Sequence, residues 1–293
     1  MKQATQKNIL VTGSEGYIGS FLCNYLESVG FNVVRHSRSL SDIRDIKQLE
    51  NDEVYRDVNL VYHLAAKTGV SESWIDSNKY SSVNALGTKE VCEFCLRIRA
   101  DLIYMSAYVY GDSGGPPIDE TFPVEPQNPY SMSKYNGEKW VEYYGATKGL
   151  GYTIVRPFNV YGAGQSQMFL IPKIIQQVET AETIVVNDLR PARDYIYIDD
   201  LIMALSLLSA DSQDQEKYNI GTGTSYRVDQ VIQLVQNIWG VNKPVIDKGE
   251  RRPHEILNCV ANIEKFTRKS NWHPTYTLRR GLEKIHRQKI LHQ

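Results

Sequence analysis

The chain has 293 residues, enough to bury a sizeable core, and it fits either one large α/β domain or a large domain with a smaller lobe. Its formal net charge of −1 leaves no basic surplus, so we expect neither nucleic acid nor a membrane surface as a partner. The apolar run at 9–11 is too brief for a signal-peptide core, and no later run approaches membrane-spanning length, which predicts a cytoplasmic protein.

Short apolar runs alternate with helical patterns in the first half of the chain. We predict strands at 8–12, 31–35, 60–65, 102–106 and 152–156, and helices at 16–30, 78–99 and 130–147. This alternation is typical of βαβ units, so we expect an α/β fold with a Rossmann-type doubly wound parallel sheet. Sheets of this kind bind ligands at the carboxyl ends of their strands, where we expect the functional residues.

The pattern loosens after Pro157, where proline, glycine and aromatic residues become frequent. Helical stretches shorten to 169–179, 198–210 and 228–239. We therefore predict a sheet domain and a smaller C-terminal α/β lobe that binds the substrate. The sheet domain would span 1–162 with a return segment near 193–222, and the lobe would comprise 163–192 and 223–293.

The four cysteines do not form a disulfide framework in a chain of this size. Cys92 and Cys95 have the spacing of a redox pair, but they lie inside a helical pattern rather than at a helix start. We predict that both are packed in the interior, and we expect no metal site.

A glycine-rich turn follows the first strand, in the run Thr-Gly-Ser-Glu-Gly-Tyr-Ile-Gly at 12–19. Gly13 allows the tight turn, Gly16 lets the backbone approach a pyrophosphate, and Gly19 lets the helix pack closely on the strand. The helix start also offers free N–H groups and a partial positive charge. The turn predicts a dinucleotide site that includes Tyr17 and Ile18, the alternative being a plain strand-to-helix turn.

The end of the second strand indicates which dinucleotide is bound. NAD sites of this kind place an acidic residue there to hold the ribose hydroxyls, but this chain has Ser37 followed by Arg38, with Arg35 close by. A hydroxyl and a guanidinium suit a 2′-phosphate, so NADP is favoured slightly over NAD. The alternative is that Arg38 is solvated or stacks on the adenine.

Tyr130 and Lys134 lie one helical turn apart in the run Pro-Tyr-Ser-Met-Ser-Lys at 129–134. This spacing puts a phenol and an ammonium on one helix face, where the cation should lower the pKa of the tyrosine. A tyrosine tuned in this way can move protons near neutral pH. The alternative is that Tyr130 only packs and that Lys134 is solvated.

Seven ordered motifs extend along nearly the whole chain. They are the glycine turn at 12–19, His-Leu-Ala-Ala-Lys at 63–67, Val-Asn-Ala-Leu-Gly-Thr at 83–88, Ser-Ala-Tyr-Val-Tyr-Gly at 106–111, Tyr-Ser-Met-Ser-Lys at 130–134, Arg-Pro-Phe-Asn-Val-Tyr-Gly at 156–162 and Arg-Asp-Tyr-Ile-Tyr-Ile-Asp-Asp at 193–200. With these motifs the chain resembles an extended short-chain dehydrogenase/reductase of the nucleotide-sugar epimerase/dehydratase family, related to the UDP-galactose 4-epimerase group.

The resemblance implies a catalytic group and a cofactor site in the sheet domain. Tyr130 would be the general acid/base at a sugar hydroxyl or keto group, Lys134 would hold the nicotinamide ribose, and Ser106 would hydrogen-bond the reacting oxygen. The remaining cofactor contacts would come from Ala65, Ala66 and Lys67, which line the cofactor, and from Asp42 and Ile43, which flank the adenine.

The resemblance also implies a substrate site. Asn159 resembles the family's substrate-binding asparagine, and Arg193 and Arg252 resemble the arginines that hold the diphosphate of a nucleotide sugar. Glu255 would take a ribose hydroxyl. The alternative for both arginines is an ordinary surface charge, and Arg251 is an equally charged neighbour of Arg252.

Two departures from the family pattern bear on the reaction. Dehydratases of the family usually carry Thr-Asp/Glu after the serine position, where this chain has Ala107 and Tyr108, so we do not expect dehydration. The lack of an acidic residue after the second strand resembles the pattern of NADP-using 4-ketoreductases, whereas the remaining motifs suit 4-epimerases equally well. We expect a 4-epimerase, with a 4-ketoreductase as the alternative and a non-catalytic dinucleotide-binding module as a third possibility.

Relatives dimerise through two long helices, so the resemblance implies a homodimer formed by the helices at 78–99 and 130–147. Apolar contacts could come from Leu86, Val91, Phe94 and Trp140. The alternative is that these side chains face only their own sheet.

Overall fold

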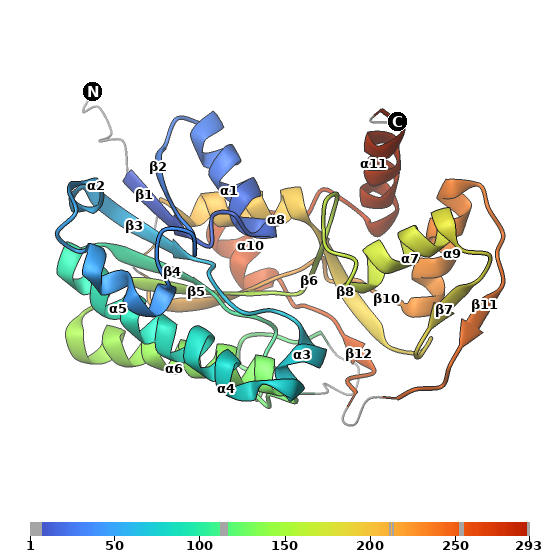
Figure 1. The fold of residues 1–293 in the computed structure, drawn as a ribbon, viewed down its shortest axis with the longest axis horizontal. Coiled ribbons are helices and arrows are strands. Elements are labelled where there is room, and N and C mark those ends of the chain that lie inside the picture. The colour runs from blue at the N-terminus through green and yellow to red at the C-terminus, as the bar shows by residue number, and fades with distance from the viewer. Residues whose placement is uncertain (1–7, 112–116, 211, 213, 252–254, 292–293) are drawn as a thin grey trace. The chain divides into compact units, whose positions relative to one another are not determined.

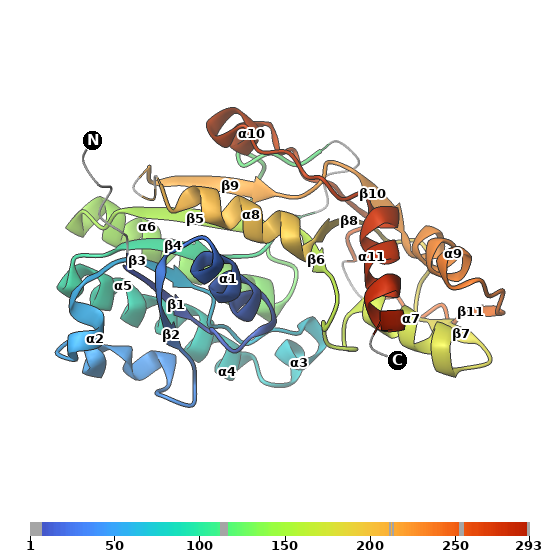
Figure 2. The ribbon, with the colours of Figure 1, turned by 90° about the horizontal axis from the view of Figure 1, so that it is seen from above.

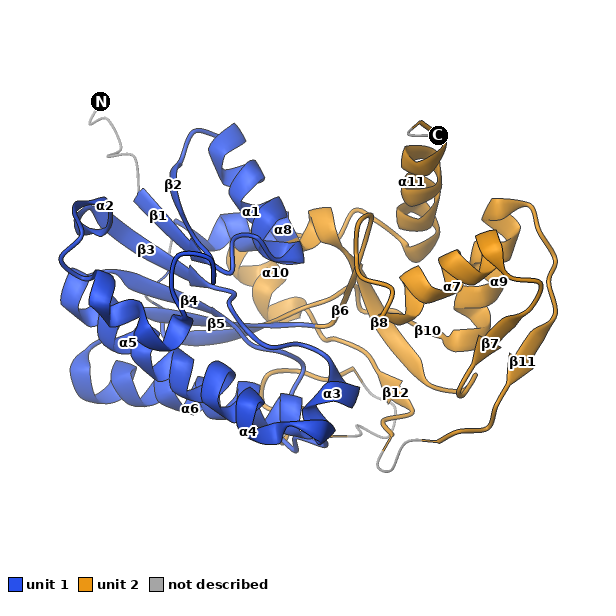
Figure 3. Ribbon diagram, in the orientation of Figure 1, with its two compact units in different colours: residues 1–109, 124–157, 202–218 blue, residues 110–123, 158–201, 219–293 orange. Residues whose placement is uncertain are grey.

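The structure, a computed structural model, describes residues 8–111, 117–210, 212, 214–251 and 255–291. The chain forms two compact units that alternate along the sequence (Figure 1 and Figure 3). The first unit comprises residues 1–109, 124–157 and 202–218, and the second comprises 110–123, 158–201 and 219–293. Within the described residues, no helix combines the length and the apolar character needed to cross a membrane.

The first unit consists mainly of alternating strands and helices, as the sequence predicted. Its elements up to residue 157 are β1 (Asn8–Thr12), α1 (Tyr17–Ser28), β2 (Asn32–His36), η1 (Ile43–Leu49), α2 (Glu53–Arg56), β3 (Val58–His63), α3 (Val70–Ile75), α4 (Ser77–Tyr80), η2 (Ser81–Leu86), α5 (Gly87–Ile98), β4 (Asp101–Met105), α6 (Pro129–Lys148) and β5 (Tyr152–Pro157). Helix α8 (Ile198–Leu208) and strand β9 (Glu216–Ile220) bring the chain back to this unit and extend across its boundaries.

Six strands form one sheet in the order β2-β1-β3-β4-β5-β9, and the four pairings from β2 to β5 are parallel. Helices α1 and α8 lie on one face of this sheet, and α5 and α6 lie on the other (Figure 1 and Figure 2). The strands are covered on both faces, which explains why they read as nearly continuous apolar runs. The expectation of a Rossmann-type doubly wound sheet is confirmed.

One hydrophobic cluster of the first unit lies between the sheet and helices α5 and α6. Val91 and Phe94 are fully buried there, as are Cys92 and Cys95, whose thiol pKa values are raised by burial. The predicted interior packing of the two cysteines is therefore confirmed. The expectation that Val91 and Phe94 supply dimer contacts is wrong, because both side chains are used in the core of their own unit.

The predicted helix at 78–99 is built from three consecutive pieces. Helix α4 continues into the π-helical turn η2 and then into α5, which ends at Arg99 in a left-handed conformation with φ of 61°. π-Helical turns are rare and occur frequently at functional sites. Side-chain patterning does not distinguish such a turn from ordinary α-helix, so the sequence predicted one uninterrupted helix.

The second unit has its own small sheets and helices. Its elements are β6 (Asn159–Tyr161), α7 (Leu170–Thr180), β7 (Ile184–Val186), β8 (Ala192–Tyr197), β10 (Ser225–Arg227), α9 (Val228–Trp239), β11 (Val245–Asp247), β12 (Asn258–Cys259), α10 (Glu264–Ser270) and α11 (Leu278–Leu291). Strand β8 is central: it pairs with β10 in antiparallel fashion and with β6 and β12 in parallel. Strands β7 and β11 form a separate parallel pair.

The predicted domain boundaries require several corrections. Residues 158–162 lie in the second unit, and the return segment to the sheet domain is 202–218 rather than 193–222. Residues 110–123 were expected in the sheet domain but belong to the second unit. Hydrogen bonds through Ile118 hold this segment, because its N–H donates to the Val260 carbonyl at 2.8 Å and its carbonyl accepts from the Asn262 N–H at 2.8 Å. These partners lie about 140 residues further along the chain, and nothing in the local pattern at 110–123 indicates them.

The close approach of α1 to the glycine turn gives a first testable prediction. A Cβ on Gly19 would lie 2.1 Å from the Gly13 carbonyl oxygen, so Gly19→Ala should lower the free energy of unfolding by about 1–3 kcal/mol in urea titrations. Ser28→Ala, an exposed change in the same helix, is the control and should shift this free energy by less than about 0.5 kcal/mol. Equal stabilities of the two variants would contradict the close approach.

Candidate functional site

The glycine turn lies at the topological switch point of the six-stranded sheet. Strands β1 and β3 are neighbours, but the connection after β1 leads to β2 on one side and the connection after β3 leads to β4 on the other. Gly13 has φ of +71°, and a Cβ there would lie 2.8 Å from the backbone nitrogen of Ala65, which follows β3. Only glycine fits this position, and ligands of open α/β sheets bind at such switch points.

The start of α1 fits the phosphates of a dinucleotide. Gly16 caps the helix without a side-chain hydrogen bond, and its N–H donates to the Gly13 carbonyl at 2.9 Å. Tyr17 and Ile18 begin the helix directly behind it, so their backbone N–H groups lie in the first turn. A cradle without side chains next to a helix N-terminus is suited to an anionic group.

The residues after β2 differ in how they are engaged. Arg35 donates to both carboxylate oxygens of Glu27 and to Asn24, so its guanidinium is used within the protein. Ser37 is buried and its Oγ lies 2.6 Å from Ser39 Oγ. Arg38 is exposed, which leaves it as the cation of this segment that a ligand can reach most directly.

Asp42 and Ile43 lie at the start of η1. The Asp42 carboxylate accepts from the backbone and the guanidinium of Arg44, and mainly the guanidinium lowers the pKa of Asp42 to about 2. Ile43 is buried and lies next to Gly87, at the start of α5. Asp42 is thus an anion bound to a neighbouring arginine, and Ile43 is an apolar side chain of the core.

The loop after β3 carries Ala65, Ala66 and Lys67, and Asn84 of the π-helical turn holds it. The Asn84 side chain accepts from the Lys67 N–H at 2.7 Å and donates to the Lys67 carbonyl at 3.0 Å. It also donates to Ser133 Oγ at 2.9 Å, and Ser133 lies in α6 between Tyr130 and Lys134. A fully buried asparagine therefore connects the predicted cofactor loop to the predicted catalytic helix.

The sequence sets the start of helix α6 at Asn128 and Pro129. Asn128 caps the helix by accepting from the Ser131 N–H at 2.9 Å, and Pro129 occupies the first turn. Tyr130 and Lys134 follow one turn apart. The Lys134 Nζ lies 4.4 Å from the centre of the Tyr104 ring in β4, and the Tyr104 hydroxyl donates to the Lys134 carbonyl at 3.1 Å.

The pKa values of this pair differ from the sequence-based expectation. The expected lowering of the pKa of Tyr130 is wrong for the protein without ligands, because burial raises that pKa, with smaller contributions from Tyr108 and Tyr80. Burial also lowers the pKa of Lys134 to about 7, partly opposed by Glu138. Lys134 is therefore only partly charged at neutral pH, which weakens its support for a Tyr130 phenolate.

Ser106 follows β4 directly and contacts α6. Its Oγ donates to Glu138 Oε1 at 2.5 Å. Glu138 is in turn bound by the Arg156 guanidinium of β5, at 2.9 Å from Nε and 2.6 Å from Nη2. All three side chains are at most 3% exposed. The structure therefore brings Ser106 to the helix that carries Tyr130 and Lys134.

Sequence reasoning assigned no role to Glu138, Arg156 or Asn84. Glu138 could have been found, because it follows Lys134 by four residues and Tyr130 by eight and so lies on the same helix face. A charged arginine inside an apolar strand was a second signal, since buried arginines are nearly always paired.

The second unit carries the predicted substrate residues Asn159, Arg193 and Glu255. The Arg193 guanidinium forms an ion pair with Glu255 and donates to the Ile256 carbonyl at 2.6 Å. The Asn159 side chain donates to the Asp194 carbonyl at 3.2 Å. The structure thus brings Arg193 and Glu255 together, whereas Arg252 lies outside the described residues.

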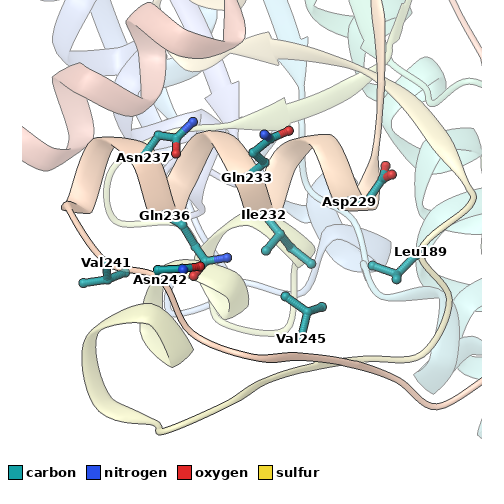
Figure 4. A pocket seen from close by; sticks show the side chains of 9 residues that line it. All are labelled: Leu189, Asp229, Ile232, Gln233, Gln236, Asn237, Val241, Asn242 and Val245. Carbon is teal, nitrogen blue, oxygen red and sulfur yellow. The ribbon is translucent and has the colours of Figure 1, made fainter.

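A hollow of about 330 Å³ in the second unit is not part of this group. It lies beside α9, where Ile232 points towards Val245 and the amides of Gln236 and Asn242 lie close together (Figure 4). None of the predicted site residues lines it. Among the residues that the structure describes, no group of three His, Cys, Asp or Glu side chains could hold a metal ion.

Lys134 gives a prediction about pH. Between pH 7 and its ordinary pKa of 10.5, the unfolded chain binds a proton that the folded protein without ligands lacks, so this residue makes stability rise with pH. Between pH 7 and pH 9, Lys134→Met should reduce the slope of the free energy of unfolding against pH by up to about 1.4 kcal/mol per pH unit, as measured by urea unfolding. Lys139→Met, an exposed change in the same helix, should keep the slope. Parallel curves for the parent and Lys134→Met would refute the assignment.

Comparison with known proteins shows the family. The model of the NAD dependent epimerase/dehydratase family matches residues 9–221. A putative UDP-glucose 4-epimerase of Methanocaldococcus jannaschii is 29% identical over 94% of this chain and 96% of the relative. A GDP-6-deoxy-D-talose 4-dehydrogenase of Aggregatibacter actinomycetemcomitans is 30% identical over 97% of this chain and 98% of the relative.

The fold comparison agrees. The structure of a UDP-glucose 4-epimerase of Thermotoga maritima with UDP-glucose has a TM-score of 0.88 and 26% identity, covering 97% of this chain and 99% of that one. The chain belongs to the NAD dependent epimerase/dehydratase family.

Proposed function

We propose that the protein is an NAD(P)-dependent nucleotide-sugar 4-epimerase that acts by reversible hydride transfer at sugar C4. The observation that carries the proposal is the arrangement of α6 on β4. Helix α6 presents Tyr130 and Lys134 one turn apart, Ser106 contacts the same helix, and the glycine turn lies in the same unit. The relatives named as 4-epimerases support the choice of reaction.

The residues divide the chemistry between them. A bound nicotinamide dinucleotide would supply the group that takes the hydride from C4 and returns it. Tyr130 takes the proton of the C4 hydroxyl while C4 loses its hydride, and it returns the proton when the hydride reaches the opposite face of the sugar. Lys134 regains its own proton beside an anionic ligand and then favours the Tyr130 phenolate. Ser106 holds the reacting oxygen in place.

We assign the substrate contacts to the second unit. Asn159, Arg193 and Arg252 would bind the nucleotide sugar, with both arginines on the diphosphate and Glu255 on a ribose hydroxyl. Because Arg193 is paired with Glu255, a diphosphate has to compete with this carboxylate or use other N–H groups of the guanidinium. Ala107 and Tyr108 provide no carboxylate beside Ser106, so the proposal does not include dehydration.

A second candidate is an NADPH-dependent reductase of nucleotide 4-keto sugars. It is favoured by the segment after β2, which lacks an acidic residue and exposes Arg38. Cofactor retention separates the candidates. Purified protein that interconverts C4 epimers without added cofactor supports the epimerase, and protein that consumes NADPH only with a 4-keto sugar supports the reductase.

The proton step is tested by Tyr130→Phe, which keeps the ring and removes the hydroxyl. We expect kcat to fall by roughly 10²-fold or more, with cofactor affinity nearly unchanged, since only the proton relay is lost. Steady-state kinetics and a cofactor titration check both parts. An unchanged kcat would refute the role of Tyr130, and a parent protein that turns over no nucleotide sugar would favour a non-catalytic binding module.

The proposed preference for NADP is tested by Arg38→Ala. If Arg38 meets a 2′-phosphate, the variant should bind NADP about tenfold more weakly and NAD with unchanged affinity, because only NADP carries that phosphate. Arg35→Ala is the matched control, since the Arg35 guanidinium is already bound to Glu27 and Asn24. Equal losses for both cofactors would exclude a 2′-phosphate contact.

A further inference from the structure

We propose that Tyr104 is a positioning residue for Lys134, whose ammonium is held against the face of the Tyr104 ring by a cation–π contact. The inference rests on the proposed function, because Lys134 takes part in the same reaction. It gives a role to a buried phenol that was not among the predicted site residues and that takes no part in the proposed proton step.

Tyr104 contacts Lys134 at two places. The Lys134 Nζ lies 4.4 Å from the centre of the Tyr104 ring, which is inside the distance of about 6 Å at which a cation is attracted by an aromatic face. The Tyr104 hydroxyl donates to the Lys134 backbone carbonyl at 3.1 Å, which ties the far end of the ring to helix α6. The lysine side chain therefore starts near the hydroxyl and ends over the ring of the same tyrosine.

Burial makes this contact important to the lysine. Tyr104 is fully buried and Lys134 is 2% exposed, so water does little to stabilise the ammonium. An ammonium that leaves water needs compensating partners, and the attraction of an aromatic face is stronger when both groups are desolvated. The ring face provides such compensation without a second charge.

The titratable groups around Lys134 are mostly neutral. Glu138 on α6 favours the ammonium, but its carboxylate already binds Arg156 at 2.6 Å. The ring of His63 on β3 lies 5.7 Å from the Tyr104 ring, and burial together with nearby Lys134 keeps the pKa of His63 well below its ordinary value. Burial also raises the pKa values of three further groups, which are neutral at pH 7: Tyr130 on α6, Tyr80 on α4 and Cys92 on α5.

The Tyr104 side chain itself stays neutral. Burial raises its pKa well above the ordinary value of a phenol, so it holds the ammonium by its π-face and not as a phenolate. An ionised carboxylate at this place would bind Lys134 strongly, whereas a neutral ring attracts it modestly. The contact therefore keeps the lysine on the helix face that it shares with Tyr130, one turn earlier, and leaves it able to bind a ligand.

The test varies the π-face and leaves the shape of the ring almost unchanged. Tyr104→Phe in the full-length protein is the reference, and difluorophenylalanine and trifluorophenylalanine at position 104 weaken the negative potential of the ring face in steps. NMR of the ε-carbon of labelled lysine gives the pKa of Lys134, whose signal is assigned by its absence from Lys134→Met. From phenylalanine to trifluorophenylalanine this pKa should fall by about 0.5 pH units or more.

A ring that only fills space would give another result. Fluorination would then leave the pKa of Lys134 unchanged, and this outcome would overturn the inference. Phe94 is the matched control, because it is fully buried in α5 of the same unit, and its replacement by trifluorophenylalanine should not shift the pKa of Lys134.

A measurement on the unaltered protein decides the question if position 104 tolerates no replacement. The ring current of Tyr104 should move the ε-methylene protons of Lys134 upfield of those of Lys148, which is exposed. Equal chemical shifts for the two lysines would overturn the inference.

Kinetics separates this inference from the proposed function. With UDP-galactose and bound cofactor at pH 7, the trifluorophenylalanine protein should have a kcat at least about twofold below that of Tyr104→Phe, because less of its Lys134 is charged. Equal kcat values would show that the contact does not serve the reaction and would overturn the inference. A parent that turns over no UDP-galactose would instead count against the proposed function, while the NMR titration still decides whether the contact exists.

Discussion

Close packing of α6 on β4 is the constraint on which the candidate catalytic group depends. A Cβ at Gly137 would lie 2.2 Å from the Tyr104 hydroxyl oxygen, so only glycine lets the helix come this near to the strand. The Tyr104 hydroxyl then reaches the Lys134 carbonyl, and the Lys134 Nζ faces the Tyr104 ring. Ser106, two residues further along, reaches Glu138. A displaced helix would lose these contacts together.

This packing also sets the electrostatics. Bringing Lys134 under the helix removes it from water, and burial outweighs the attraction of Glu138. The protein without ligands therefore holds a neutral Tyr130 beside a lysine that is only partly charged at neutral pH.

The sequence predicted most of the fold of the first unit because its signals are local. The strands are continuous apolar runs, Gly13 turns the chain locally with φ of +71°, and Gly19 packs against Gly13 only six residues before it. Ser106 and Glu138 are 32 residues apart, and Arg193 and Glu255 are 62 apart. Which residues form pairs of this kind depends on how strands and helices are placed in space. Sequence analysis therefore identified Ser106, Arg193 and Glu255 as site residues, but it predicted neither contact and missed Glu138. The attachment of 110–123 to the second unit was missed for the same reason.

The central claim is that the hydride removed from C4 returns to the same sugar. UDP-galactose carrying deuterium at C4 tests it directly, with purified protein, no added cofactor, and mass spectrometry and NMR of the product. We expect UDP-glucose that retains the deuterium at C4, because the hydride never leaves the site. Loss of the deuterium from the sugar, or a reaction that proceeds only with stoichiometric added cofactor, would contradict this account.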